Sequence, residues 1–264
     1  MTKSLLASAL LLALLPAHAA INVGSTGFVY NQNFDSLTTS TTAVAWVNGS
    51  TLPDWHLFIS TLADAPTIAA DTGSSTSGTF RSFGASASSE RALGSVASGG
   101  AYFGAPASGA VAGWIATSFV NGSGAALDGF TLAFDSEQWR NGGNANLQSL
   151  VFEYGFGASF GAVAGWVAPG GVYDAVSVIN TTTAAAVDGN SVGLLAARGG
   201  AISASWAAGD TLWLRWADRN DVGSDHGLAI DNLAFGVTAV PEPGALVLML
   251  AGLAAVGFVA RRRA

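Results

Sequence analysis

The chain has 264 residues, of which 50% are hydrophobic and only 10% charged, and its formal net charge at pH 7 is −7. Such an acidic chain repels nucleic acid, because recognition of nucleic acid depends on neutralising phosphates. Since it contains no cysteine, disulfide bonds and thiol chemistry are excluded.

The first 20 residues have the three regions of a secretory signal peptide. A positive charge at Lys3 precedes an apolar run over residues 4–15, and Ala17-His18-Ala19 is a small-x-small cleavage pattern. Cleavage after Ala19 or Ala20 fits this pattern. The sequence therefore predicts that residues 1–20 are a signal peptide and that the chain is exported.

Residues 21–239 have the pattern of a single all-β domain. Apolar side chains alternate with others in short segments, as β-strands require, and Gly-, Ser- and Asn-rich turns separate these segments. We expect an antiparallel β-sandwich of the jelly-roll type. The strand candidates are residues 27–34, 113–120, 130–134, 150–156, 172–178, 201–206, 211–216 and 228–236.

Three carboxylates at or near strand ends raise the possibility of hydrolysis. A glycosidase needs two carboxyl groups about 5 to 9 Å apart across the scissile bond. Asp135 and Glu137 are two residues apart on one strand, and Glu153 lies on the next candidate strand. The E-x-D-x-x-E pattern of laminarinases is absent. We therefore expect no enzymatic activity, and a polysaccharide-acting hydrolase that uses these three residues is the alternative.

The eight tryptophans have two interpretations, as core residues or as platforms for sugar rings. Most of them must lie in the core of a domain of this size. Trp213 and Trp216 lie on opposite faces of one candidate strand, so that one of them can face outward. We take Trp139 and Trp213 as the candidates for glycan contact.

A polar segment near the end of the domain, residues 216–235, is rich in oxygen ligands. Asp218, Asn220 and Asp225 could bind Ca²⁺ in an irregular loop site. The segment is not an EF-hand, because Val222 and Ala229 stand where ligands are needed. The alternative is a turn in which these side chains bond their own backbone, and both interpretations stay open.

The last 25 residues, 240–264, have three ordered parts. Pro241-Glu242-Pro243 precedes an uncharged run over residues 244–260, which ends in Arg261, Arg262 and Arg263. A helix over this run would be roughly 25 Å long, enough to cross a thin bilayer with the arginines on the cytoplasmic side. The tail resembles the PEP-CTERM sorting signal of Gram-negative bacteria. The resemblance implies export by the Sec machinery, recognition by an exosortase and delivery to the cell surface or extracellular matrix.

Two further motifs resemble jelly-roll carbohydrate-binding modules and LamG-like sandwiches. They are YNQNFDSL, residues 30–37, and IDNLAF, residues 230–235. The resemblance implies that the first and last strands lie side by side and that a structural Ca²⁺ ion bridges them through Asp35 and Asp231. Taken together, the sequence predicts a surface-sorted, non-enzymatic protein, either a binding module for extracellular polysaccharide or a structural one.

Overall fold

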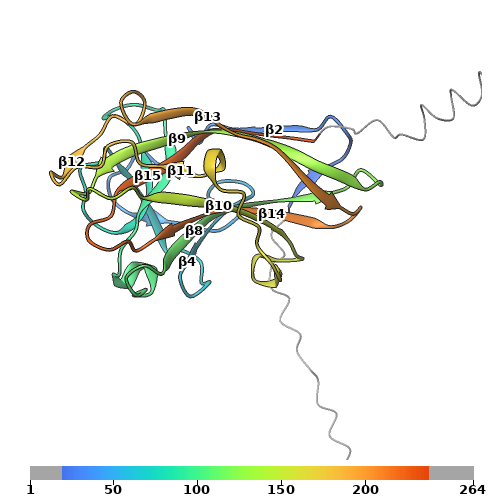
Figure 1. Ribbon diagram of the computed structural model, residues 1–264, viewed down its shortest axis with the longest axis horizontal. Coiled ribbons are helices and arrows are strands. Elements are labelled where there is room, and N and C mark those ends of the chain that lie inside the picture. The colour runs from blue at the N-terminus through green and yellow to red at the C-terminus, as the bar shows by residue number, and fades with distance from the viewer. Residues whose placement is uncertain (1–19, 238–264) are drawn as a thin grey trace, which may run out of the picture.

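The computed structural model describes residues 20–237, which form two β-sheets packed face to face (Figure 1). The smaller sheet has six strands in the order β1-β8-β14-β10-β11, and β4 pairs with β8 beside this path. Its strands are β1 (Ile21–Val23), β4 (Trp55–Ile59), β8 (Val111–Asn121), β10 (Ser149–Phe156), β11 (Ala175–Val176) and β14 (Thr211–Arg219).

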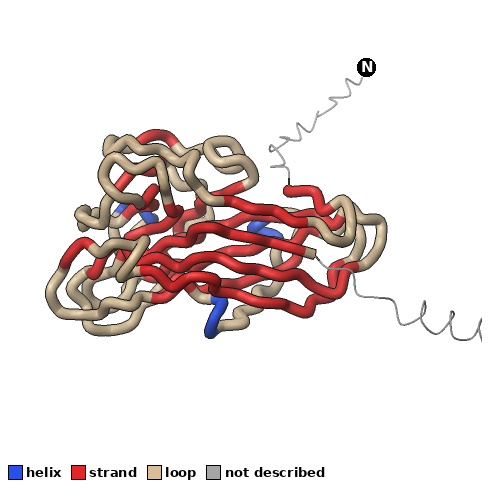
Figure 2. The backbone as a smooth tube through the Cα atoms, turned by 90° about the horizontal axis from the view of Figure 1, so that it is seen from above, coloured by secondary structure: helices blue, strands red, loops and turns tan. Residues whose placement is uncertain are grey.

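The larger sheet has nine strands in the order β12-β9-β15-β7-β6-β5-β3, with β13 on β9 and β2 on β15. Figure 2 shows long strands running side by side, with loops at both ends and more of them at one end. Its strands are β2 (Val29–Gln32), β3 (Val44–Ala45), β5 (Thr67–Asp71), β6 (Thr79–Phe83), β7 (Ala92–Val96), β9 (Leu127–Asn141), β12 (Ala185–Ala186), β13 (Leu194–Trp206) and β15 (Gly227–Gly236).

Aromatic side chains fill the space between the two sheets. Phe119 of β8 stacks on Phe235 of β15 with ring centroids 3.8 Å apart, and Trp216 of β14 meets Phe134 of β9 edge-on at 5.4 Å. All four rings are buried in the main core. Burial of such large rings supplies much of the hydrophobic stabilisation of a domain. The all-β prediction is confirmed, and the two sheets are arranged as in a β-sandwich.

The two motifs near the ends of the domain lie side by side. β2 pairs antiparallel with β15, with Gln32 opposite Leu233 and Tyr30 opposite Phe235. Beyond the ladder, the Val237 N–H donates to the Phe28 carbonyl at 3.0 Å. The neighbourhood of these motifs expected from the sequence is therefore confirmed.

The strands missed in the sequence analysis are mostly in the large sheet. β5, β6 and β7 are almost wholly buried on both faces, so that their side chains show no apolar and polar alternation. On the outer face of these strands Phe83, Ala92 and Val96 form a second apolar cluster with Trp139. In contrast, residues 172–178, expected to be a strand, contain most of the 3-10 helix η3 (Gly171–Tyr173) and only the two-residue β11.

Both expected terminal segments, residues 1–19 of the signal peptide and residues 240–264 of the sorting signal with its helix over 244–260, lie outside the described residues. Among residues 20–237, no helix has the length and apolar character needed to span a bilayer.

Candidate functional site

Three carboxylates converge on the outer face of the large sheet. Asp231 comes from β15, Glu137 from β9 and Glu90 from the segment just before β7. In the sheet register Ala229 lies opposite Glu137, two residues before Asp231, so that both acids point to the same face. Each residue has a ligand atom within 4.8 Å of those of the other two.

This carboxylate cluster is buried and incompletely hydrogen-bonded. Glu137 is 1% exposed and Asp231 is 2% exposed. The Trp139 indole N–H donates to Glu137 Oε2 at 2.7 Å, and the Asn190 amide donates to Glu90 Oε2 at 2.5 Å. Asp231 Oδ1 and Glu90 Oε1 are also buried, yet neither accepts a hydrogen bond from a described residue.

Burial makes the charged forms of two of these acids costly. It raises the pKa of Glu137 to about 7, although the hydrogen bond from Trp139 opposes the shift. It also raises the pKa of Asp231 to about 8, and the neighbouring charges of Glu137, Glu90 and Asp35 add to this rise. Within residues 20–237 the ion pairs are Arg81 with Asp71 and Arg215 with Glu153, and neither reaches the cluster. Arg91, next to Glu90, interacts with its charge, but the Arg91 guanidinium is hydrogen-bonded to Ser82 and forms no ion pair with the described acids of the cluster.

Left-handed backbone occurs at three non-glycine residues that adjoin Asp231, Asp35 or Asp135. Asn232 (φ 48°) follows Asp231, and Phe34 (φ 56°) precedes Asp35. Ala197 (φ 54°) donates its N–H to Asp135 Oδ1 at 2.8 Å. Backbone of this kind is costly for residues with a Cβ atom and is often found at functional sites.

Asp35 and Asp231, the two residues expected to bridge the terminal strands, interact electrostatically, but Asp35 does not join the converging acids. Asp35 lies close enough for its charge to raise the pKa of Asp231. However, Asp35 is exposed and its Oδ1 accepts the Arg91 N–H at 3.1 Å. It is not one of the three acids that converge. Glu90 is one of the three, but it lies in an irregular loop, and no pattern in the sequence indicated its role.

Asp218, near the end of β14, and the loop that follows it engage separate partners. Asp218 points into the space between the sheets, where Ser95 Oγ donates to its Oδ2 at 2.6 Å, and burial raises its pKa to about 8. Asn220 donates to the Pro106 carbonyl at 3.0 Å. Asp225 Oδ1 accepts the Asp221 N–H at 2.7 Å, within the loop itself. These three residues are not among the converging acids found in the described part of the chain.

The three acids considered for hydrolysis lie on two different faces of the molecule. Asp135 and Glu137 share the outer face of the large sheet, where Asp135 also accepts the Asn232 amide at 3.0 Å. Glu153 lies on the outer face of the small sheet, where Arg215 binds its Oε2 at 2.6 Å. The aromatic core separates Glu153 from the other two residues.

The two tryptophans expected to contact glycans are buried. Trp139 is 2% exposed and lies parallel to Phe83 with centroids 6.1 Å apart. Trp213 is 5% exposed, packs against Phe160 and donates its indole N–H to the Gly157 carbonyl at 3.1 Å. Contact with a sugar ring would require either residue to be uncovered.

A half-buried aromatic side chain stands on the outer face of the small sheet instead. The Arg215 guanidinium lies 3.7 Å from the centroid of the Trp166 ring and is bound by Glu153. Glu153, Trp166 and Arg215 form what we call the small-sheet patch. This combination could not be recognised in the sequence, because Trp166 belongs to a Gly- and Ala-rich loop far from Arg215 in the chain.

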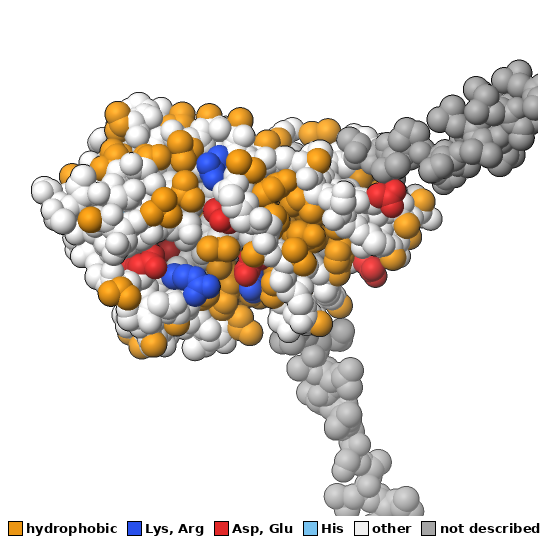
Figure 3. All heavy atoms as spheres, viewed as in Figure 1, with side chains coloured by type: hydrophobic (Ala, Val, Ile, Leu, Met, Phe, Trp, Pro, Cys, Tyr) orange, Lys and Arg blue, Asp and Glu red, His pale blue; other side chains and the backbone are white. Residues whose placement is uncertain are grey.

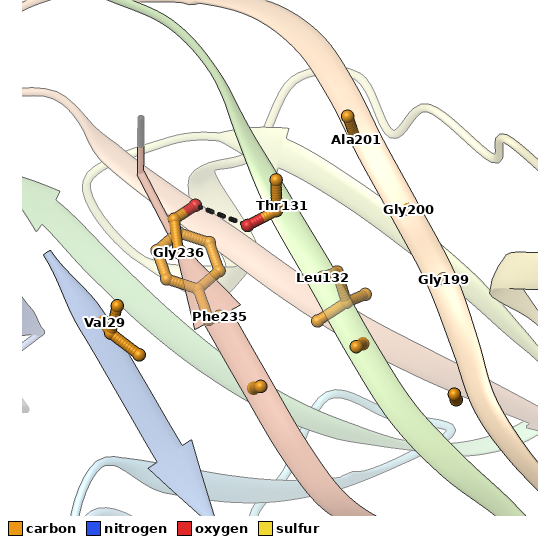
Figure 4. Close-up of a pocket in the computed structure, with 11 residues that line it drawn as sticks. Val29, Thr131, Leu132, Gly199, Gly200, Ala201, Phe235 and Gly236 are labelled. Atoms are coloured by element: carbon orange, nitrogen blue, oxygen red, sulfur yellow. Dashed lines mark hydrogen bonds between the residues drawn. The ribbon is translucent and has the colours of Figure 1, made fainter. Parts of the chain in front are cut away.

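A shallow hollow of about 410 Å³ lies on the outer face of the large sheet, over β2, β15, β9 and β13 (Figure 4). Its floor is made of small residues such as Ala133, Gly199 and Ala234. The Thr131 hydroxyl that lines it is bonded to the Gly236 carbonyl. The face of the molecule shown in Figure 3 has few charged side chains among many apolar ones.

The fold and the carboxylate cluster define an all-β, two-sheet protein with a concentrated acidic site. Residues 239–263 match the PEP-CTERM protein-sorting motif, so the resemblance of the tail is confirmed, and this motif indicates export and sorting to the cell surface. No curated protein matches the chain. Among solved structures, the chain is similar to the CBM22-1 xylan-binding domain from Paenibacillus barcinonensis Xyn10C, with 8% identity and a TM-score of 0.39, over 82% of this chain and 99% of that one.

Proposed function

We propose that this protein is an exported, surface-sorted component of the envelope or exopolysaccharide matrix that binds glycans or has a structural role there. The observation that carries the proposal is the PEP-CTERM match at residues 239–263. In this proposal residues 1–20 direct export through the Sec machinery. The apolar run over 244–260 then holds the chain in the inner membrane until an exosortase processes it, and the mature part is a jelly-roll domain.

A non-enzymatic role is supported by the positions of the acids. Hydrolysis of a glycosidic bond requires two carboxyl groups on either side of one bond. Glu153 cannot meet Asp135 or Glu137, because the sandwich lies between them. Glu137 and Asp231 are close together, but both are almost fully buried and leave no room for a sugar ring.

Glycan binding is supported by the chemistry of the small-sheet patch. Trp166 is a half-buried aromatic residue with the Arg215 guanidinium over one face of its ring, and Arg215 with Glu153 offers a planar donor group beside an acceptor. Sugars are recognised by such combinations, since their C–H faces pack on rings while their hydroxyl groups need donors and acceptors. The arginine and carboxylate are already held in place by each other.

The experiment is a glycan array of bacterial and plant polysaccharides combined with a reducing-sugar assay. We expect binding without release of new reducing ends, and weaker binding by Trp166→Ala. The matched control is Val222→Ala, a highly exposed residue in another loop, which should bind like the wild type. New reducing ends would establish the hydrolase instead, and absence of binding to every glycan would leave the structural role.

A further inference from the structure

Arg140, near the end of β9, is a buried cation with one edge of its guanidinium free. The residue is 8% exposed, and its Nη1 donates to the carbonyls of Gly73 and Ser74 at 3.1 and 3.3 Å. Its Nε and Nη2 donate to no residue within 20–237, and they are not among the fully buried polar atoms. Arg140 also forms no ion pair in this part of the chain. A buried charge without a counter-charge is costly, so the free edge calls for an anionic partner.

Three other arginines show what the same edge does elsewhere in the molecule. In Arg215, Nε and Nη2 both reach a carboxylate oxygen at 2.6 Å. In Arg198 the two atoms donate to two carbonyl oxygens at 2.6 Å, and in Arg91 both donate to Ser82. In Arg140 this edge is open to a ligand. Its two parallel N–H groups match the two oxygens of a carboxylate, which arginine binds with a pair of hydrogen bonds.

Arg140 lines a second, smaller hollow, with a volume of about 200 Å³. Three residues with hydroxyl groups, Thr76, Ser98 and Ser224, line it as well, together with Asp225. Hydroxyl groups can donate hydrogen bonds to the oxygens of an anion or of a sugar. Sites for drug-sized ligands have volumes of about 300–1,000 Å³. This hollow therefore suits one small charged group and not a whole oligosaccharide.

We propose that Arg140 and this hollow, together called the Arg140 site, bind the carboxylate of a uronate residue in an acidic polysaccharide. The choice of a carboxylate rests on the free edge of Arg140 and on the hydroxyl groups around it. The polysaccharide as its carrier rests on the proposed surface function, because a protein of the exopolysaccharide matrix meets such polymers. The Arg140 site is separate from the small-sheet patch, since β9 belongs to the large sheet whereas Glu153 and Arg215 belong to strands of the small one.

Asp225 is the one acid that lines the hollow, and its charge opposes an anionic ligand. Its Oδ1 already accepts the Asp221 N–H. Burial raises the pKa of Asp225 to about 7, and the neighbouring charge of Asp221 adds to this rise, so its negative charge is incomplete at neutral pH. Removal of this charge should therefore strengthen the binding of a carboxylate.

The test is calorimetry with two ligands that differ in charge alone. Oligogalacturonate carries a carboxylate on each sugar, whereas its methyl ester carries none. We expect oligogalacturonate to bind the purified protein and the methyl ester to bind about tenfold more weakly or worse, since a charge-assisted hydrogen bond is lost. The formal net charge of the chain is −7, so general electrostatic attraction does not favour a polyanion, and binding would report a local cation. Free galacturonate and sulfate are measured alongside, and galacturonate should bind more tightly.

Three variants and a matched control assign the ligand to the Arg140 site. Arg140→Lys keeps the positive charge but removes the paired N–H groups, and should weaken binding about tenfold or more. Arg198→Lys makes the same change where the edge is already occupied, and should bind like the wild type. Ser224→Phe fills the hollow from an exposed position and should also weaken binding, so the test stands if Arg140→Lys fails to fold. Asp225→Asn should bind more tightly than the wild type.

The proposal is overturned if neither galacturonate nor its oligomer binds, if the methyl ester or sulfate binds as tightly as the galacturonate ligands, or if Arg140→Lys and Ser224→Phe both bind like Arg198→Lys. Its failure is distinguishable from failure of the proposed function. Glycans that bind through Trp166 while galacturonate does not would retain the proposed function and overturn the Arg140 site. Galacturonate that binds at Arg140 while no glycan of the array is bound would support the carboxylate site and overturn polysaccharide as its carrier.

Discussion

Asp231 of β15 lies directly opposite Asp135 of β9 in the register of the large sheet. Like charges in this position destabilise a pair of strands. The two carboxylates differ in their hydrogen bonds. Asp135 accepts hydrogen bonds from Ala197 and Asn232, whereas Asp231 Oδ1 accepts none from the described residues. The Ca²⁺ ion that the terminal motifs imply at Asp231 would turn this unfavourable contact into a favourable one.

The first prediction concerns the stability of Asp231→Asn. In a chelator such as EDTA, the variant loses a buried carboxyl group that repels its neighbours, so it should melt at the same temperature as the wild type or higher. With saturating Ca²⁺ the order should reverse, because only the wild type gains the free energy of binding. A difference of 1 kcal/mol corresponds to about 2–4 °C in Tm for a domain of this size. Calorimetric melts in both buffers measure it.

The same order of stability in the two buffers would count against the Ca²⁺ ion implied at Asp231. A Ca²⁺-dependent rise in Tm that persists in Asp231→Asn would assign the ion to other residues.

The second prediction concerns pH and Asp218. Burial raises its pKa to about 8, from an unfolded value of about 3.9, and the charges of Asp225 and Asp221 contribute to the rise. The folded state therefore holds a proton that the unfolded state releases, and this contribution to stability is lost as pH rises from about 4 to 8. Asp218→Asn should have little effect near pH 4 and should stabilise the protein relative to the wild type at pH 8.

Urea unfolding of both proteins at several pH values, with Ca²⁺ constant, gives the difference in unfolding free energy. A difference that does not change between pH 5 and 8 would show that Asp218 is ionised in the folded protein.

The third prediction concerns Phe160, in the 3-10 helix η2 (Phe160–Ala162). Its ring stacks on Phe58 with centroids 4.2 Å apart and also contacts Trp114, Trp166 and Trp213. Phe160→Ala would leave a cavity under the loop and should destabilise the protein by about 3–5 kcal/mol. Hydrogen exchange should also become faster in residues 157–170, while the β9 and β15 amides keep the order of their protection.

The fourth prediction compares two glycines. A Cβ atom at Gly94 of β7 would lie 2.2 Å from the Leu228 carbonyl oxygen of the paired strand, whereas one at Gly161 would meet nothing within 4 Å. Gly94→Ala should therefore be strongly destabilising because the two backbones must separate. Gly161→Ala is the matched control and should change the unfolding free energy by less than about 1 kcal/mol. Equal effects would show that the strands are not so closely paired.

Alternation of apolar and polar residues predicted the strands whose two faces have different environments. β10 and β14 alternate because one face packs in the core and the other carries residues such as Glu153 and Arg215. β5 to β7 could not be recognised, since loops cover their outer face as well. Only part of the candidate site could be predicted from the sequence. Asp231 lies in a recognisable motif, but its meeting with Glu137 and Glu90 depends on strand register and on a loop, which one sequence does not reveal.

The buried positions of Trp139 and Trp213 have a similar origin. Alternation along β14 correctly places Trp213 and Trp216 on opposite faces, and Trp216 lies in the main core. The outer face is not solvent, however, because the segment containing Phe160 and Trp166 folds over it. Alternation shows which face a residue occupies, but it does not show what covers that face.

The location of the protein in its native host tests the central claim most directly. Cells are separated into cytosol, inner membrane and surface or matrix fractions, and the protein is followed with an antibody against residues 20–237. We predict that most of it lies in the surface or matrix fraction, shortened at both ends, and that deletion of residues 239–263 abolishes its sorting there. Full-length protein found mainly in the cytosol would contradict the account.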